Sequence, residues 1–218
     1  MKPHIAAPTA RRVCRIVSTC GAARADGGYR RGMTSLPQER PESTPTIGTS
    51  VTADDFKRAF RGHPGGIAVI TAYGEHGPVA LTASSVSSVS ADPPLLIFSV
   101  SSLSSATPTI VAASTIVVHL LDAEDIGLAR AGATSGLDRF ADTSAWSRLP
   151  TGEPVYHGVR AWLRCAVVSR MDAGGSTVIA AQALQVDVER DLEPGEPGAA
   201  LVYHNRTWHR LGEHSRLD

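Results

Sequence analysis

Short apolar segments recur along residues 51–218, and most of them have the character of β-strands. Residues 67–73 (IAVITAY) and 115–121 (TIVVHLL) are rich in β-branched side chains, and residues 95–100 (LLIFSV) form an unbroken apolar run. Apolar or alternating runs of this length, bounded by Gly, Pro and Asp, predict strands. By the same pattern, further strands are predicted at residues 79–90, 159–171, 176–190 and 200–211.

Helices are predicted to be few and short. The segment TADDFKRAFRGH begins with Thr52, which is followed three residues later by Asp55 as in a capping box, and Phe56 and Phe60 fall on one helix face. The following HPGG (63–66) should end this helix. Residues 122–133 begin with an aspartate and carry acids in the first turn, which also predicts a helix.

Many short strands with short helices between them favour a mainly β fold. The expected architecture is a closed or nearly closed antiparallel barrel. A parallel α/β sheet is less favoured, because most of the crossover helices that it requires are missing.

The chain changes character near residue 50. Residues 1–50 hold eight basic and three acidic side chains, whereas residues 51–218 hold 13 basic and 18 acidic ones. The first segment lacks a sustained apolar period, so residues 1–50 are predicted to be a disordered basic extension, 51–212 the folded domain and 213–218 a short tail. The basic start resembles a transit peptide but no apolar core follows it; alternatively, translation begins at Met33.

Charge and cysteine content narrow the class of protein. The balanced charge, 21 basic against 21 acidic side chains, gives no general argument for nucleic acid or an anionic membrane as partner. Outside residues 1–50 the chain has only Cys165, which suits a reducing compartment. No apolar run approaches the roughly 18 residues of a membrane span. We therefore expect a cytoplasmic protein without a nucleic-acid or membrane partner.

Several familiar catalytic motifs are missing from the sequence. It contains no G-x-G-x-x-G after a strand, no G-x-x-x-x-G-K-[ST], no H-E-x-x-H and no C-x-x-C. His204 and His209 are five residues apart on a predicted strand, which places them on opposite faces and argues against a shared metal. We expect no metal site, and in an enzyme the reactive group would come from a cofactor.

Residues 81–105 (LTASSVSSVSADPPLLIFSVSSLSS) contain ten serines and one threonine but no lysine or arginine. Two interpretations are open. The hydroxyls belong either to solvated strands and a linker, or to an uncharged cradle in which hydroxyls and backbone N–H groups bind a phosphate.

The order of the segments bears on this choice. The segments FKRAFRGHPGGIAVITA, GPVALTASSVSSVSADPPLLIFSVSSLSSA, DRFADTSAW, GVRAWLRCAVV and LVYHNRTWHRL succeed one another between residues 55 and 211. Together they resemble the short-chain flavin reductase family, the small reductase components of two-component monooxygenases. The serine-rich stretch is the most specific of these similarities.

The resemblance implies an FMN-binding split β-barrel that forms a homodimer. It implies FMN or FAD as flavin, NADH or NADPH as hydride donor, and a separate flavin-dependent monooxygenase that receives the reduced flavin. It also implies that His204 lies near the nicotinamide. The flavin-binding positions that it implies are Thr82, Ser84, Ser85, Val86, Ser87, Ser90, Ser104, Ser105 and Thr107. Ser85 departs from the family pattern, which often has asparagine there.

Alternatives remain at the level of function and of single residues. A barrel of this kind could hold its flavin tightly and act on an organic substrate, or bind flavin without catalysis as a sensing module. His119, Trp162 and Cys165 lie in apolar strands and are expected in the core. Arg139 either binds an anion or pairs with Asp138 and caps a helix.

Overall fold

The computed structural model describes residues 48, 50–193, 195–196 and 198–217. The predicted extension therefore lies outside the described residues, except for Gly48 and Ser50, and so does the alternative start at Met33. The helices are α1 (Ala53–Arg61), α2 (Thr107–Ala112), α3 (Ile126–Ala133) and the 3₁₀ helices η1 (Ala123–Asp125) and η2 (Glu213–Ser215). The strands are β1 (Gly65–Gly66), β2 (Ala68–Gly74), β3 (Gly77–Ala83), β4 (Ser87–Ala91), β5 (Pro94–Ser101), β6 (Thr115–Leu120), β7 (Trp146–Arg148), β8 (Pro154–Tyr156), β9 (Ala161–Ala173), β10 (Ser176–Val188), β11 (Leu201–His204) and β12 (Thr207–Arg210).

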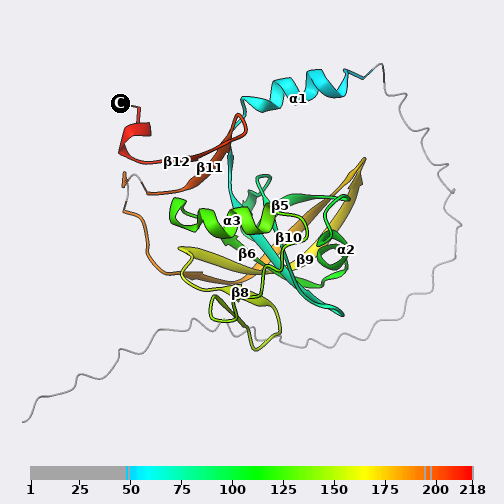
Figure 1. Cartoon of the computed structure of the whole chain (residues 1–218), viewed down its shortest axis with the longest axis vertical. Coiled ribbons are helices and arrows are strands. Elements are labelled where there is room, and N and C mark those ends of the chain that lie inside the picture. Colours follow the sequence, from blue (N-terminus) through cyan, green and yellow to red (C-terminus); the bar gives the residue numbers. More distant parts are fainter. Residues whose placement is uncertain (1–47, 49, 194, 197, 218) are drawn as a thin grey trace, which may run out of the picture. The chain divides into compact units, whose positions relative to one another are not determined.

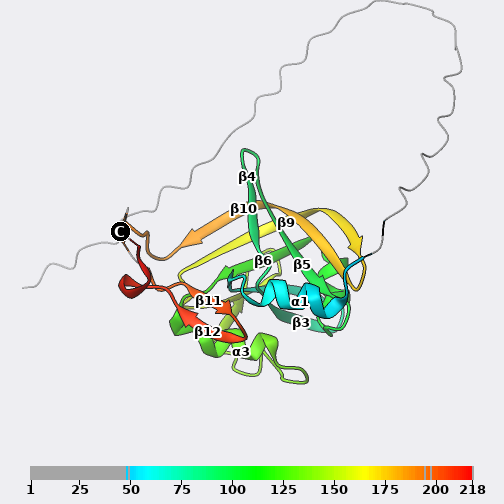
Figure 2. The same cartoon turned by 90° about the horizontal axis from the view of Figure 1, so that it is seen from above.

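The main sheet is antiparallel and has the strand order β3-β2-β6-β9-β10-β5-β4. It curls so that residues of β3 also contact β5, which nearly closes a barrel (Figures 1 and 2). A small sheet of β1, β11 and β12 and a hairpin of β7 and β8 complete the β-structure of the described chain. The prediction of a mainly β, antiparallel barrel is confirmed.

Strand β2, next to the edge strand β3, is buried on both faces over Ala68–Ala72. Ala68 and Ile70 point into the barrel core with Phe98 and Ile179, whereas Val69 points to a second apolar cluster outside the barrel. That second cluster lies beneath α3, β8 and the small sheet, and it includes Ala80, Ala129, Phe140, Tyr156 and Leu201. Because successive side chains of a strand alternate between faces, an unbroken apolar strand needs a cover on each side.

The predicted helix caps are confirmed. The backbone N–H of Asp55 donates to Thr52 Oγ1 at 3.1 Å, and the Thr52 hydroxyl donates back to the Asp55 carboxylate at 2.8 Å. At the next predicted helix, the backbone N–H of Asp122 donates to Asp125 Oδ2 at 2.9 Å, and η1 leads into α3. Both starts depend on side chains within four residues, which explains why the sequence reveals them.

The single strand predicted over residues 79–90 is wrong. The chain leaves the sheet after Ala83 and returns at Ser87, so β3 and β4 are separate strands. In the connection, Ser85 replaces a backbone partner: its hydroxyl oxygen lies 3.0 Å from the Ser99 N–H and 3.2 Å from the Ser99 carbonyl. The hydroxyls of this segment therefore do not share one continuous strand face.

The strand predicted over residues 200–211 is also wrong, because it is a hairpin. Its turn consists of Asn205 (φ 47°) and Arg206 (φ 64°), and it pairs β11 with β12. His204 and His209 consequently lie on the same face, with ring centroids 5.6 Å apart. The expectation that they occupy opposite faces is corrected by this turn. The β7–β8 hairpin was not predicted at all.

The helices and the titratable side chains of the described residues have two further properties. None of their helices is both long enough and apolar enough to span a bilayer. Nor do three or more His, Cys, Asp or Glu side chains among them gather in a geometry suited to a metal ion.

Candidate functional site

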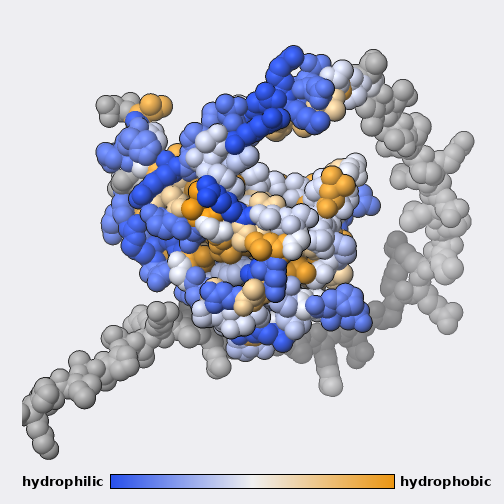
Figure 3. Space-filling view, viewed as in Figure 1, coloured by the Kyte–Doolittle hydropathy of each residue, from blue (hydrophilic) through white to orange (hydrophobic). Residues whose placement is uncertain are grey.

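A cleft of about 720 Å³ lies between α1 and the barrel (Figure 3). Four segments from three distant parts of the sequence form its walls. They are the inner side of α1, the stretch His63–Gly66, the connection Ser84–Ser87 and the β11–β12 turn. Its size lies within the range of small-molecule and cofactor sites.

Helix α1 forms one wall without packing into the core. None of its residues is buried, and Phe56 and Phe60 are 55% and 57% exposed. Their rings contact each other at a tilt of 31° with centroids 4.6 Å apart, and both line the cleft. The far end of α1 is attached to the β11–β12 turn, since the Asn205 N–H donates to the Arg61 carbonyl at 3.0 Å.

The opposite wall carries hydroxyl groups. Ser84, Ser85 and Ser87 line the cleft together with Val86. This wall lies directly against β1: a Cβ atom on Gly65 would be 2.7 Å from the carbonyl oxygen of Ser84. Only glycine allows that approach, so Gly65 helps to set the position of the hydroxyls.

The cleft also contains three cations, so it is not the uncharged cradle that the serine-rich stretch alone suggests. Lys57 and Arg61 come from α1, and Arg206 comes from the β11–β12 turn. Sequence reasoning missed them because they lie outside the serine segment. The spacing of Lys57 and Arg61, four residues apart on a predicted helix, was the available signal for a shared face.

Two of the implied flavin-binding residues lie away from this cleft. The Thr82 hydroxyl donates to the Ala129 carbonyl at 2.6 Å, which fastens β3 to α3 where Gly132 leaves room for it. Ser90 lies on β4, half-buried and paired with Leu95 of β5. Neither residue lines the cleft, so the structure does not bring them together with Ser84–Ser87.

The implied phosphate loop lies at a second, smaller hollow. The Thr107 hydroxyl donates to the Ser101 carbonyl at 2.6 Å, and Ser104 accepts the N–H of Ala106 at 3.4 Å. Ser105 is exposed and lines a hollow of about 100 Å³ together with Arg139 and the β3 residues Val79 and Ala80.

His204 ends β11 and is half-buried beside His209. Its neighbours Tyr203 and Asn205 line the cleft, but His204 does not. In a single chain, its ring is therefore not part of the cleft wall.

The side chains expected in the core are found there. His119 and Cys165 are fully buried, and Trp162 packs against the second apolar cluster. Burial raises the pKa of the Cys165 thiol to about 12, against a small opposing effect of Arg164, so the thiol is protonated and unreactive.

Arg139 caps a helix, as half of one interpretation proposed, but among the ion pairs of the described residues it has none with Asp138. It donates to the carbonyls of Ala131 at 3.2 Å and Thr134 at 2.8 Å, at the end of α3. Asp138 accepts the N–H of Phe140 at 2.9 Å. The guanidinium nevertheless borders the hollow that contains Ser105.

This arrangement can bind and orient a ligand, but it offers little acid–base chemistry. Among the described residues that line the cleft there is no aspartate, glutamate or cysteine. Hydroxyls, three aromatic rings and three cations suit a planar, anionic molecule such as a nucleotide. The chemistry at such a site would come from the bound molecules.

Comparison with known proteins agrees with this geometry. Residues 60–212 match the family described as "Flavin reductase like domain". An NADH:FMN oxidoreductase of Rhodococcus qingshengii is 39% identical over 168 residues, which is 77% of this chain and 86% of that protein.

Solved structures show the same fold. The flavin reductase domain protein of Arthrobacter sp. FB24 has a TM-score of 0.68 and 30% identity, covering 76% of this chain and 97% of its own. BorF, the flavin reductase component of a bacterial two-component tryptophan halogenase, has a TM-score of 0.64 and 26% identity, covering 74% and 99%. The chain therefore belongs to the flavin reductase-like family.

Proposed function

We propose that this protein catalyses the NAD(P)H-dependent reduction of a flavin and supplies the reduced flavin to a separate monooxygenase. The family membership supports the reaction, and the relatives described above support FMN and NADH as the first pair to test. FAD and NADPH are the alternatives. BorF, which serves a separate halogenase, supports the transfer of reduced flavin to a partner.

The residues present fit a flavin. Ser84, Ser85 and Ser87 would contact the flavin in the cleft, and the hollow at Ser105 and Arg139 would accept its phosphate. The hollow lies beside Pro78–Ala80 of β3, and the serine wall of the cleft begins at Ser84, directly after that strand. The four to five residues from Val79–Ala80 to Ser84 span roughly 15 Å of extended chain.

Bound together, the two nucleotides would supply the chemistry, which is transfer of a hydride from the reduced nicotinamide to the flavin, with one proton taken from solvent. The protein's share is to hold the two rings in contact and to limit access of water. This division agrees with a cleft whose described lining has hydroxyls and cations but no acid–base pair.

The observation that carries the proposal is the hydroxyl wall of Ser84–Ser87 facing α1 across the cleft. The test is steady-state oxidation of NADH and NADPH with FMN, FAD or riboflavin as acceptor. We expect turnover with at least one pair. Absence of turnover with every pair would refute the proposal.

The state of the flavin separates two kinds of oxidoreductase. If flavin is a substrate, protein purified and dialysed should be colourless, and the rate should saturate with added flavin. Protein that stays yellow through dialysis would instead indicate a tightly bound cofactor and a different final acceptor. Flavin binding without nicotinamide oxidation would indicate a sensing module.

We also propose a homodimer. Large apolar side chains are exposed along β9, β10 and β5, and pairing would cover them. They are Ile97, Val168, Met171, Leu184, Val186 and Val188. Sedimentation equilibrium should give twice the mass of the chain. The placement of His204 near the nicotinamide and the cytoplasmic location stay predictions.

A further inference from the structure

The three cations of the cleft come from two elements that a backbone hydrogen bond joins. Arg61 ends α1, and the Asn205 N–H donates to its carbonyl, so the residue preceding Arg206 in the turn is bonded to the backbone of Arg61. Lys57 lies one helical turn before Arg61 on the same side of α1. The helix and the turn that carry the three positive side chains are thus joined through their backbones, and all three side chains line the same cleft.

These charges are not consumed by ion pairs of the fold. Within the described part of the chain, neither Arg61 nor Arg206 has an acidic side chain within 4 Å, and Lys57 has only a 3.6 Å contact to the exposed Asp54. Arg58, on the outer side of the same helix, differs: it pairs with Asp55 at 2.9 Å. The two guanidinium groups in the cleft are therefore available to a ligand.

The backbone at Arg206 argues for a role beyond folding. Both turn residues have positive φ, and two-residue hairpin turns of this kind favour glycine at the second position. An arginine there is locally unfavourable compared with glycine. Unfavourable backbone conformations of non-glycine residues concentrate at functional sites.

Beside the cations, α1 presents a flat apolar surface. Phe56 and Phe60 are more than half exposed and face the cleft. A dinucleotide has the matching composition, with two phosphate charges next to two planar rings. Guanidinium groups bind phosphate through paired hydrogen bonds, and aromatic rings stack on bases.

We propose that Lys57, Arg61 and Arg206 bind the pyrophosphate of the nicotinamide dinucleotide, and that α1 is thus the donor-binding element. The inference depends on the proposed function. The flavin's own phosphate has a separate candidate place, the hollow of Ser105 and Arg139, which none of these three cations lines. A pyrophosphate carries two negative charges, which the three cations of the cleft match better than the single guanidinium that lines the hollow.

The test compares two hydride donors that differ in the pyrophosphate. NADH carries it, and reduced nicotinamide riboside does not. The variants are Arg61→Gln and Arg206→Gly, the second of which replaces the arginine by the residue that the turn prefers. Arg58→Gln is the matched control, because it removes the same charge from the outer side of α1.

At saturating FMN, the KM for NADH should rise about tenfold in each cleft variant, as expected for the loss of one charge-assisted hydrogen bond. The KM for reduced nicotinamide riboside should change less than twofold. Calorimetric titration of flavin-free protein with ADP-ribose should show about a tenfold weaker Kd in the same variants. Arg58→Gln should match wild type in all three measurements.

Three results would overturn the inference. One is that both variants turn over at the wild-type rate with an unchanged KM for NADH. That result would leave the proposed flavin reductase activity intact. Another is a rise in KM for FMN but not for riboflavin, which assigns the cations to the flavin phosphate. The third is equal loss with both donors, which indicates a structural role. If wild type turns over no flavin with any donor, the proposed function itself fails.

Discussion

At the scale of single residues, His119 shows how burial determines a protonation state. Its Nδ1–H donates to the Val69 carbonyl at 3.0 Å, and its Nε2 accepts the Tyr156 N–H at 3.0 Å. Both ring nitrogens are satisfied only in the neutral form. Burial lowers the pKa of His119 from 6.5 to about 4, against a smaller opposing effect of the Val69 hydrogen bond.

This lowered pKa predicts acid sensitivity. In the unfolded chain His119 takes up a proton near pH 6.5, but in the folded chain only near pH 4. Its contribution to stability is therefore complete above pH 6.5 and is lost as the pH falls to 4. Over that range the free energy of unfolding should decrease by about 1.4 kcal/mol per pH unit.

Urea denaturation at several pH values measures this decrease. His119→Gln should be less stable at neutral pH but should lose less stability on acidification. Parallel pH profiles for the two proteins would show that His119 does not titrate in this window.

Arg206 is expected to favour ligand binding at the expense of stability. Replacing it with glycine relieves a left-handed backbone conformation at φ 64°, so Arg206→Gly should raise the free energy of unfolding by about 1 kcal/mol. The urea midpoint measures this directly. A destabilised variant would mean that the arginine side chain makes contacts important for the fold.

At the scale of elements, the contact of β1 with the serine connection decides the shape of the cleft. Gly65→Ala places a Cβ atom 2.7 Å from the Ser84 carbonyl oxygen, so one of the two segments must move. We expect a cost of about 1–3 kcal/mol in unfolding free energy and weaker flavin binding. Urea denaturation and a fluorescence titration with FMN measure the two effects.

Gly62→Ala is the control for this prediction. Gly62 does not line the cleft, has a φ of −86° and has no atom within 4 Å of an added Cβ, so the substitution should leave flavin binding unchanged and stability equal or slightly higher. If both alanine variants behave alike, the close approach at Gly65 is not what positions the serines.

Elements with local signals were predictable, and those that depend on distant partners were not. Thr52 with Asp55 and Asp122 with Asp125 cap their own helices, so their sequence spacing is sufficient. The break after Ala83 involves a distant partner: Ser85 binds the backbone of Ser99, which is 14 residues away. The Asn205–Arg206 turn was missed because arginine is an uncommon residue at positive φ.

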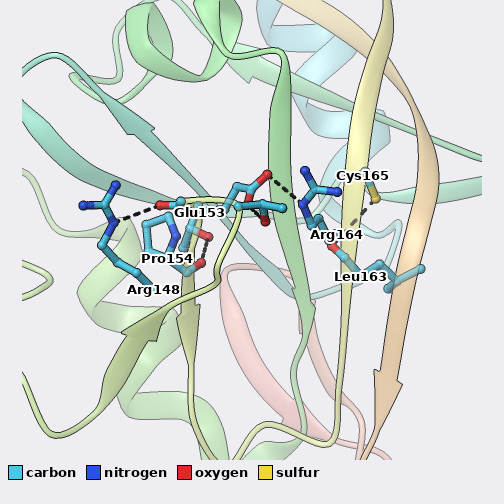
Figure 4. Close-up of polar contacts among 9 residues, drawn as sticks. Arg148, Glu153, Pro154, Leu163, Arg164 and Cys165 are labelled. Carbon is cyan, nitrogen blue, oxygen red and sulfur yellow. Dashed lines mark hydrogen bonds and ion pairs between the residues drawn. The ribbon is translucent and has the colours of Figure 1, made fainter. Parts of the chain in front are cut away.

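At the scale of the whole molecule, a buried ion pair joins the loop before β8 to the barrel. Glu153 is 3% exposed, and its carboxylate accepts a hydrogen bond from Arg164 of β9 at 2.8 Å (Figure 4). Burial alone would raise the pKa of Glu153, but hydrogen bonds from Thr115, Thr151 and Arg164, among others, lower it overall. Glu153 thus contributes stability that is lost as the pH falls below its usual pKa of 4.5.

Removal of only one partner should lower the free energy of unfolding strongly, because it leaves the other charge buried and unpaired. Glu153→Ala and Arg164→Ala each leave a charge in a poorly solvated place, for an expected loss of about 3 kcal/mol or more. The double variant leaves neither charge, so its loss should be smaller than the sum of the two. Urea denaturation of the four proteins of this cycle measures the difference, and strictly additive losses would contradict the coupling.

The sequence by itself determined the class of fold, most strands and the helix starts. Alternation of side chains and capping are properties of neighbouring residues, so they can be read without knowledge of the partners. The serine-rich stretch also stood out in the sequence, but its exit from the sheet between β3 and β4 did not. The family resemblance rested on the same local segments and is confirmed by the match over residues 60–212.

Only the tertiary structure decided what faces the serines. The hydrogen bond from Asn205 to Arg61 brings the last hairpin to the first helix, and with it Arg206 to Lys57 and Arg61. A second long-range hydrogen bond, from the Thr82 hydroxyl to α3, keeps that hydroxyl away from the cleft. Such contacts join segments that are far apart in the chain, so no local sequence pattern encodes them. Which charged side chains line the cleft is therefore decided only when the chain folds.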